Sequence, residues 1–418
     1  MNQIATHIME RDPEAYSYLV WEQDRRCYEL GLIASENYVS EAVLEANGSI
    51  FTNKYSEGYP GKRYYAWQEF VDKIENLAIE RARKLFWAEY INVQPHSGSP
   101  ANLAVFFALL QPGDTILGMN LDHGWHLSHG HPLNYSGKMF HIIPYGVDPK
   151  TELIDMDIVE QLAKQHKPKL IIAGFSAYSR SLDWKRFRQI ADETGAILMA
   201  DIAHIAWLIA GGALENPVPY CDIITTTTHK TLRWPRGAMI MAKEKYGPDI
   251  ARSVFPGIQG WPHDHTIFAK AIAFWEALDP SFSTYVRQVI ANARQMAKIF
   301  GEEWIRVISG GTDNHLILLD IYGSLGLTGK EAEKILEHIG VSTNKNMIPY
   351  DTRKPLDPSW IRVGTPAITT RWFDEVASEK LTHIIIRALR NPTDESLLLD
   401  LKSQVRELCI QYPIPGIN

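Results

Sequence analysis

The chain has 418 residues, of which 45% are hydrophobic and 22% are charged, a composition typical of globular proteins large enough for several domains. Its formal net charge of −7 argues against a nucleic-acid-binding or membrane-surface protein. The three cysteines are far apart and form no paired pattern, which favours a reducing compartment. The N-terminus lacks the apolar segment of a secretory signal, so we expect a cytoplasmic protein without a membrane partner.

The first ninety residues predict helices around one polar loop. Residues 1–30 are expected to be a helical arm, because Asp12-Pro13-Glu14 is a typical helix start. Residues 55–65 are rich in turn formers, tyrosines and charges, which predicts a binding loop. Residues 70–86 predict an amphipathic helix. Its expected buried face consists of Phe70, Ile74, Leu77, Ala78 and Leu85.

A candidate anion site follows this helix. A predicted strand at 90–93 leads into Ser97-Gly98-Ser99, and a helix is predicted at 101–110. In this order, backbone N–H groups and hydroxyls gather where the helix dipole is positive. The segment therefore predicts a site for a phosphate or a similar anion.

From residue 114 onward, strands and helices alternate, which predicts a mostly parallel sheet with covering helices. Strands are expected at 114–119, 170–175, 196–201, 221–228 and 238–242, and a helix is expected at 184–194. Ligands of such sheets bind beyond the carboxyl ends of the strands. The side chains at these ends are therefore expected to share one pocket: Ser97, Ser176, Asp201, His229 and Lys230.

Lys230 closes a strand and directly follows four threonines and His229. One interpretation is a solvated surface lysine. The other is a Schiff-base lysine, whose amine must lose its proton before it attacks an aldehyde and is helped to do so by desolvation. The hydroxyls and the imidazole suit a phosphate and a polar ring held beside that amine.

The predicted domain organisation has three parts: the arm at 1–30, a large domain at 31–280 and a small C-terminal domain at 281–418. Residues 265–299 are expected to be largely helical, with an interruption near Pro280. In the small domain we expect a strand at 316–319 and helices at 330–339 and 375–389.

Over nearly its whole length, the chain resembles the serine hydroxymethyltransferase family. The stretches that carry the resemblance are LIASEN (32–37), YSEGYPGKRYY (55–65), VQPHSGS (93–99), SAYSR (176–180), DIAHIA (201–206), TTTTHKTLR (225–233), FPGIQG (255–260), SGGTDNHL (309–316), NKN (344–346) and IRVGTPAITTR (361–371). Each stretch alone has low specificity, but together and in this order they are highly specific.

The resemblance implies an α/β fold of fold type I, with a seven-stranded, mostly parallel sheet in the large domain and a smaller α+β domain. It implies pyridoxal 5'-phosphate as cofactor and tetrahydrofolate as co-substrate. The implied reaction moves a one-carbon unit reversibly between serine and tetrahydrofolate, giving glycine and methylene-tetrahydrofolate. The resemblance also implies an obligate homodimer with shared active sites, and it leaves a tetramer open.

The resemblance assigns roles residue by residue. Lys230 carries the cofactor, His126 stacks on its ring, and Asp201 faces the pyridine nitrogen and keeps it protonated. His229 and Glu57 complete the expected catalytic set, with Glu57 as the acid or base near the serine hydroxyl. The further expected cofactor contacts are Ser97, Gly98, Ser99 and His229 at the phosphate, Ser176 and His204 near the phenolic oxygen, and Tyr55 and Gly260 from the partner subunit.

The substrate and the folate have their own expected residues. Arg362 is expected to clamp the amino-acid carboxylate through its planar guanidinium, helped by Ser35 and by Tyr65 of the second subunit. The expected border of the folate site is Leu121, Trp125, His126, Leu127, Asn346, Lys354, Pro355 and Leu356.

The chain departs from the family in one repeated way, because tryptophan stands where the family usually has glycine. The positions are Trp67, Trp87, Trp125, Trp207, Trp234, Trp261, Trp360 and Trp372, and Trp275 and Trp304 are further candidates. Eight overpacked sites at roughly 1–3 kcal/mol each would cost roughly 8–24 kcal/mol, against a typical stability of about 5–15 kcal/mol. One interpretation is an enzyme with a remodelled pocket. The other is a gene whose UGA codons encode glycine, as in some bacteria.

Two further functions stay open at this point. A folate-independent β-hydroxy-amino-acid aldolase or transaldolase of the same fold would have Trp125 filling the folate site. A catalytically silent binding protein is the other alternative. The presence of Lys230, Asp201, His126 and Arg362 argues against the silent protein.

Overall fold

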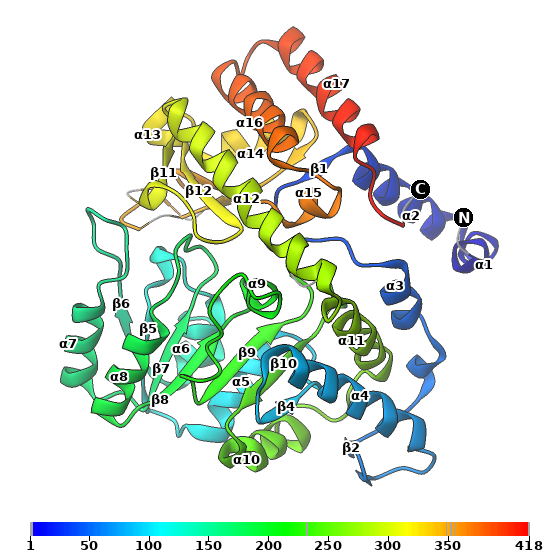
Figure 1. Ribbon diagram of the computed structural model, residues 1–418, viewed down its shortest axis with the longest axis vertical. Helices are drawn as coiled ribbons and strands as arrows, with labels where there is room; N and C mark the ends of the chain where they lie inside the picture. The colour runs from blue at the N-terminus through cyan, green and yellow to red at the C-terminus, as the bar shows by residue number, and fades with distance from the viewer. Residues whose placement is uncertain (1–2, 231–232, 348, 352, 355, 417–418) are drawn as a thin grey trace.

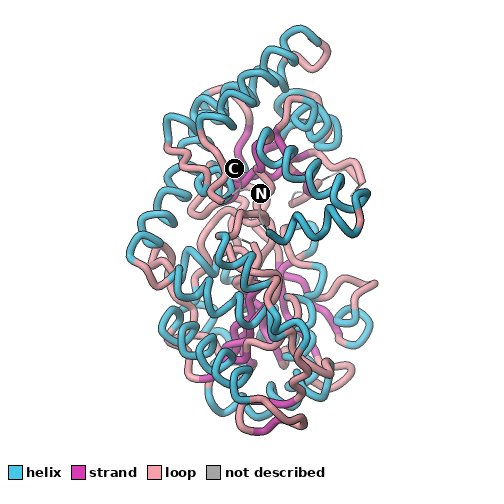
Figure 2. The backbone as a smooth tube through the Cα atoms, turned by 90° about the vertical axis from the view of Figure 1, so that its right-hand side faces the viewer, coloured by secondary structure: helices cyan, strands magenta, loops and turns pink. Residues whose placement is uncertain are grey.

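The computed structural model describes residues 3–230, 233–347, 349–351, 353–354 and 356–416. The expected folate residue Pro355 lies outside these ranges. Two sheet-containing parts lie one above the other, as Figures 1 and 2 show. The two chain ends lie near each other beside the upper part.

The lower part is built on a seven-stranded sheet of order β4-β10-β9-β8-β7-β5-β6. Its strands are β4 (Tyr90–Asn92), β5 (Thr115–Met119), β6 (His141–Tyr145), β7 (Leu170–Gly174), β8 (Ile197–Asp201), β9 (Ile223–Thr227) and β10 (Ala238–Ala242). Only β10 runs antiparallel to its neighbours, β4 and β9. The sheet is therefore mostly parallel, as predicted, and the carboxyl ends of all strands but β10 lie along one edge.

Helices cover this sheet on both faces, so the strands β7, β9 and β10 are buried at every position. The strands β7 and β10 are apolar, whereas β9 ends in three threonines. The helices of this part are α3 (Glu41–Asn47), α4 (Glu69–Phe86), α5 (Gly98–Leu109), α6 (Tyr135–Met139), α7 (Met156–His166), α8 (Trp184–Thr194), α9 (Ala206–Ala210), α10 (Gly247–Arg252) and α11 (Asp264–Ala277). The predicted buried face of α4 is partly wrong. Phe70 is exposed, whereas Val71, Glu75 and Ala82 are buried. Glu75 is buried because it belongs to an interior polar network, in which it accepts hydrogen bonds from Arg63 and Gln94.

The upper part contains a four-stranded antiparallel sheet of order β11-β12-β15-β14. Its strands are β11 (Arg306–Val307), β12 (Leu316–Asp320), β14 (Asn344–Asn346) and β15 (Trp360–Gly364). Its helices are α13 (Ile321–Leu325), α14 (Gly329–His338), α15 (Pro366–Thr370), α16 (Glu375–Arg390) and α17 (Glu395–Gln411). The predicted helices at 330–339 and 375–389 correspond to α14 and α16.

The long helix α12 (Pro280–Glu302) runs between the two parts (Figure 1). Phe282 and Val286, near its beginning, belong to the hydrophobic core of the lower part. Met296 and Phe300, near its end, belong to the core of the upper part. One helix is thus shared by both cores, and the domain boundary at residue 280 stays a prediction.

The N-terminal arm forms α1 (Gln3–Arg11) and α2 (Pro13–Tyr28), and the Asp12 side chain caps α2 by accepting from the N–H of Ala15. The strand β1 (Leu30–Gly31) then pairs in parallel with β13 (Val341–Ser342), which ties the arm to the upper part. Among the described helices, none combines the length and the apolar character that a membrane crossing requires.

Several tryptophans have a backbone conformation that is typical of glycine. Trp67, Trp87, Trp304 and Trp372 have φ values of 59°, 57°, 59° and 69°, in the left-handed region that favours glycine. Their side chains are between 73% and 93% exposed, so packing gives no compensation for this conformation. These are four of the nine non-glycine residues with positive φ in the described chain.

Other tryptophans of this set are buried: Trp125, Trp207, Trp234 and Trp360. Among the described residues, the indole N–H groups of Trp125, Trp207 and Trp360 have no hydrogen-bond partner. Buried tryptophans usually find such a partner. An unpaired buried donor costs about 1–3 kcal/mol, so these side chains are poorly suited to their positions.

Candidate active site

A cavity of about 290 Å³, counted to its open mouth, lies at the edge where the parallel strands end. Of the five side chains expected to share a pocket, Ser176, Asp201 and Lys230 line this cavity, whereas Ser97 and His229 do not. Its lining is Gly98, Asn102, His126, Phe175, Ser176, Asp201, Ala203, Thr225, Thr226, Thr227 and Lys230. Lys230 and Asp201 thus share one pocket with His126 and with the beginning of α5.

Lys230 brings a buried amine into this cavity. Burial lowers the pKa of Lys230 to about 8, although the negative charge of Asp201 acts in the opposite direction. A substantial fraction of the amine is therefore unprotonated near neutral to mildly alkaline pH. An unprotonated amine is what attack on an aldehyde requires.

Asp201 ends β8 and is held as a carboxylate by two neighbours. His129 Nε2 donates to its Oδ2 at 2.7 Å, and Asn102 Nδ2 donates to the same oxygen at 2.9 Å. Burial alone would raise the pKa of Asp201, but the hydrogen bonds and the nearby imidazoles hold it well below its usual value. The cavity therefore contains a fixed negative charge that can pair with a protonated ring nitrogen.

His126 lines the same cavity as a neutral imidazole. Burial lowers the pKa of His126 to about 4, which the charge of Asp201 offsets only in part. Its Nδ1 lies 2.7 Å from the Ser128 hydroxyl and also accepts from the Ser128 N–H. The ring is thus held in one orientation beside Asp201 and Lys230.

One corner of the cavity suits an anion. Ser97 is the N-cap position of α5, and its side chain makes no capping hydrogen bond, so the hydroxyl is available to a ligand. The buried hydroxyl of Thr227 has no partner among the described residues. A Cβ added at Gly98 would lie 2.6 Å from the Thr227 methyl group, so only glycine permits this close approach. Ser99 follows at the start of the same helix.

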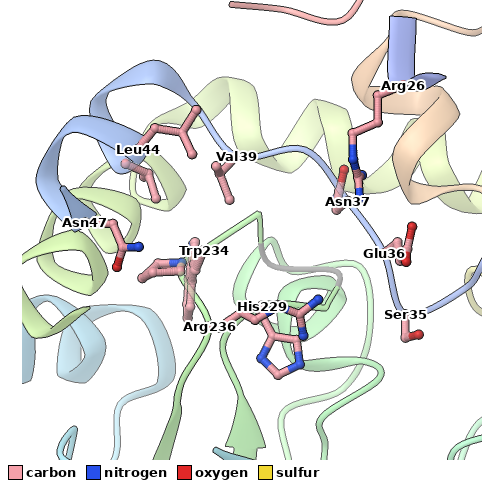
Figure 3. A pocket seen from close by; sticks show the side chains of 12 residues that line it. Arg26, Ser35, Glu36, Asn37, Val39, Leu44, Asn47, His229, Trp234 and Arg236 are labelled. Atoms are coloured by element: carbon pink, nitrogen blue, oxygen red, sulfur yellow. The ribbon is translucent and has the colours of Figure 1, made fainter. Parts of the chain in front are cut away.

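A groove of about 650 Å³, including its open mouth, lies beside this cavity (Figure 3). Ser35 lies on one side of it, and His229 and Arg236 lie on the other. Because His229 lines the groove and Lys230 lines the cavity, the two compartments meet at this peptide. Burial, together with Arg236 and Lys230, lowers the pKa of His229 to about 4.

Arg362 on β15 is a buried guanidinium at the junction of the two parts. It donates through Nε to Asn344 Oδ1 at 3.1 Å and through Nη1 to the carbonyl of Ser176 at 2.6 Å. Burial lowers the pKa of Arg362 to about 10, so it remains a cation at neutral pH. His204 is also buried, stacks on His315, and has a pKa well below its usual value because of burial.

A second group of expected residues lies outside this cavity and groove. The rings of Tyr55 and Tyr65 are 5.0 Å apart, and that of Tyr55 is 5.2 Å from Trp261. These residues and Gly260 share an exposed patch that includes the hairpin β2 (Gly58–Tyr59) and β3 (Lys62–Arg63). Neither they nor Glu57 line the cavity or the groove, so their assignment to a partner's site stays a prediction.

Among the described residues expected at the folate site, His126 lines the cavity and the others do not. Leu127 and Leu356 are exposed, Lys354 is exposed, and Leu121 and Asn346 are half-buried. Trp125 is only 6% exposed and packs against Gly118, where an added Cβ would lie 2.0 Å from its ring. The indole therefore points into the core and does not fill an open folate pocket, which weakens the aldolase alternative.

Sequence reasoning missed His129 and Asn102, the two residues that fix Asp201. His129 was one imidazole among several in the stretch 123–131, and Asn102 was an ordinary polar residue on a predicted helix. The signal that could have found Asn102 is its position on the first turns of a helix that begins at the anion site. Its amide also accepts from Thr225 Oγ1 at 2.7 Å, which links two strand ends.

A family model described as serine hydroxymethyltransferase matches residues 8–385, which is nearly the full length. Members of this family are pyridoxal-phosphate-dependent transferases of fold type I. The seven-stranded, mostly parallel sheet, the antiparallel C-terminal sheet and the lysine at the end of β9 agree with that architecture. The chain belongs to the serine hydroxymethyltransferase family.

Proposed function

We propose that the chain is a serine hydroxymethyltransferase that exchanges a one-carbon unit between serine and tetrahydrofolate. The observation that carries this proposal is the pairing of Lys230, whose pKa is lowered to about 8, with the fixed carboxylate of Asp201 in one cavity at the strand ends. That pairing supplies an amine for a carbonyl carbon and an anion for a protonated heterocycle.

The residues present fit pyridoxal phosphate. The unpartnered Thr227 hydroxyl and the uncapped start of α5 suit its phosphate, and Asp201 suits its pyridine nitrogen. Lys230 suits its aldehyde, and His126 suits the face of its ring. When bound, the cofactor supplies an electron sink for the carbanion left by loss of the one-carbon unit.

The chain's own residues contribute binding and proton control. Arg362 holds the amino-acid carboxylate, because its guanidinium is charged, planar and fixed by Asn344 and the Ser176 carbonyl. Asp201 maintains a negative charge at the ring nitrogen, since His129 and Asn102 keep it ionised. The neutral imidazole of His126 can pack against a ring without the desolvation cost of a cation.

We also propose that the active enzyme is a homodimer. Tyr55, Tyr65 and Glu57 would then act at the partner's cavity, since they lie away from the cavity of their own chain. The exposed aromatic patch around Tyr55 and Trp261 supports this arrangement.

The test compares the chain with its Lys230→Ala variant. The purified parent chain, taken in the more stable of its tryptophan and glycine forms, should take up pyridoxal phosphate, absorb in the visible, and cleave serine only when tetrahydrofolate is present. Lys230→Ala should lose the visible absorption and turnover while keeping its far-UV circular dichroism. An unchanged visible spectrum in Lys230→Ala would overturn the assignment. Folate-independent cleavage of β-hydroxy amino acids by the unaltered chain would favour the aldolase.

A further inference from the structure

Lys270 on α11 is buried against the loop that leads to the phosphate corner. The phosphate corner is the corner of the cavity at Gly98 and Thr227, beside Ser97. The side chain of Lys270 is 1% exposed. Its ammonium donates to the carbonyls of Val93 at 2.6 Å, Ala238 at 2.8 Å and Pro95 at 3.4 Å. All three hydrogen bonds go to main-chain oxygens of two strand ends.

These two strand ends are connected to the segments that form the phosphate corner. Pro95 lies two residues before the N-cap of α5 and also accepts from the N–H of Ala238 at 3.0 Å. Gly237, just before Ala238, accepts from the N–H of Thr228, which directly precedes His229. The ammonium of Lys270 thus holds the start of α5 and the end of β9 at a fixed separation.

The side chain of Lys270 lies close to the backbone at Gly237, and only glycine leaves room for this approach. A Cβ added at Gly237 would lie 2.6 Å from Lys270 Cε and 2.9 Å from its Nζ. Any larger residue at this position would displace the ammonium from its carbonyls. The fit indicates a specific site for the amine, because a lysine stem that merely filled space would not need this glycine.

Gln259 provides a second set of hydrogen bonds to the loop around Pro95. Gln259 accepts from the N–H of His96 at 3.0 Å and donates to the carbonyl of Gln94 at 3.2 Å. The main chain on both sides of Pro95 is therefore anchored. With Lys270 below it, the loop before Ser97 has little freedom to move.

Carbonyl oxygens that converge on one point repel each other unless a cation or a donor lies between them. A buried carbonyl left without a donor costs about 1–3 kcal/mol, which corresponds to roughly a five- to hundredfold change in an equilibrium constant. Burial lowers the pKa of Lys270 to about 7, although the charge of Glu75 acts in the opposite direction, so the charged form is present at and below neutral pH. In that form Lys270 contributes to the lowered pKa values of His96 and His229.

We propose that Lys270 is a positioning residue for the cofactor phosphate: its ammonium fixes the strand ends so that the start of α5 and His229 face one anion. The inference deepens the proposed function and rests on it, because it concerns the phosphate of the proposed cofactor. Lys270 itself would not touch that phosphate.

The test measures two affinities of the cofactor-free protein, one for pyridoxal phosphate and one for pyridoxal, which lacks the phosphate. Lys270→Met keeps the volume and removes the donors, and Lys270→Gln keeps part of the donors. Lys243→Met is the matched control, because Lys243 lies just past the other end of β10 and pairs with Asp222 at 3.0 Å. The parent is whichever form of the chain, with tryptophan or glycine at the positions discussed below, folds more stably.

Lys270→Met should bind pyridoxal phosphate roughly tenfold or more weakly and bind pyridoxal as the parent does, because only the phosphate corner is disturbed. Lys270→Gln should lie between the two, and Lys243→Met should match the parent. An equal loss for both ligands, or no loss for either, would overturn the proposal. If Lys270→Met does not fold, Lys270→Gln decides by the same comparison. If the parent binds neither ligand, the proposed function falls and this inference falls with it.

Discussion

At the scale of single residues, the most informative number is the pKa of about 8 for Lys230. We predict that the rate at which the cofactor-free protein takes up pyridoxal phosphate rises with pH through about 8. The sign follows from the chemistry, since a lowered pKa increases the unprotonated, nucleophilic fraction at a given pH. Stopped-flow absorbance at a series of pH values measures this profile. A profile centred near the ordinary lysine value of about 10.5 would contradict the burial argument.

Arg362 gives a second prediction at this scale. Lys in its place keeps the charge but loses the planar fork, so Arg362→Lys should raise the KM for serine roughly 10–100-fold with a smaller change in kcat. Arg306→Lys is the control, because Arg306 is an exposed arginine that pairs with Asp320 and Glu152 far from the cavity. Steady-state kinetics on the three proteins decides. A fall in kcat at unchanged KM would assign Arg362 to the chemical step and remove it from substrate binding.

Single residues of the site also differ in how well they could be predicted from the sequence. Lys230, Asp201 and Ser176 could be placed together because each lies at or just after the end of a strand, and parallel strands share their carboxyl edge. His129 could not be placed, because its partner Asp201 is 72 residues away and no local pattern joins them. Residues that act by orienting others leave a weak trace in the sequence, since their partners come from tertiary structure.

At the scale of elements, the same contrast holds. The strands β5, β7, β8, β9 and β10 were predictable because each contains a run of apolar or β-branched residues. The strand β6 was missed, since His141 and Pro144 interrupt its apolar pattern. It lies at the edge of the sheet, where proline is tolerated. The antiparallel direction of β10 could not be predicted either, because direction depends on how the chain returns to the sheet.

The third prediction concerns two tryptophans at helix C-termini. Trp87 is the C-cap residue of α4, and Trp304 lies just beyond α12; both have the left-handed conformation that favours glycine at a helix C-terminus. Trp87→Gly and Trp304→Gly should each raise the free energy of unfolding by about 1 kcal/mol, because the strain of the side chain is removed. Chemical denaturation measures the change.

The control for these variants is Trp184→Gly. Trp184 is buried at the start of α8 with ordinary helical geometry, so its loss should lower the free energy of unfolding by roughly 3–5 kcal/mol. If Trp87→Gly and Trp304→Gly also destabilise the protein, these positions are true tryptophan positions and the glycine interpretation loses its backbone support.

At the scale of the whole molecule, the shared site gives the fourth prediction. Tyr55 is exposed and does not line the cavity that contains Lys230, and a dimer would bring the two residues to one cavity. Mixing Lys230→Ala with Tyr55→Phe chains should therefore restore activity, because a heterodimer contains one site in which both residues are intact. Activity is measured after the mixed chains have exchanged subunits. Residual activity equal to the average of the two homodimers would indicate self-contained sites.

The last prediction compares two whole chains, one with tryptophan and one with glycine at positions 67, 87, 125, 207, 234, 261, 360 and 372. Two kinds of misfit add up in the tryptophan form. Exposed side chains force left-handed backbone, and buried indoles leave their N–H groups unpaired among the described residues. Trp261 also stands directly after Gly260, in the patch expected to meet the partner subunit. We therefore expect the glycine chain to melt at a higher temperature and to cleave serine in the presence of tetrahydrofolate. The tryptophan chain should be less stable or inactive with folate. Equal melting temperatures and equal folate-dependent activities would refute the idea that UGA encodes glycine in this gene. A stable tryptophan chain that cleaves β-hydroxy amino acids without folate would make it an aldolase whose core has adapted to the larger side chains.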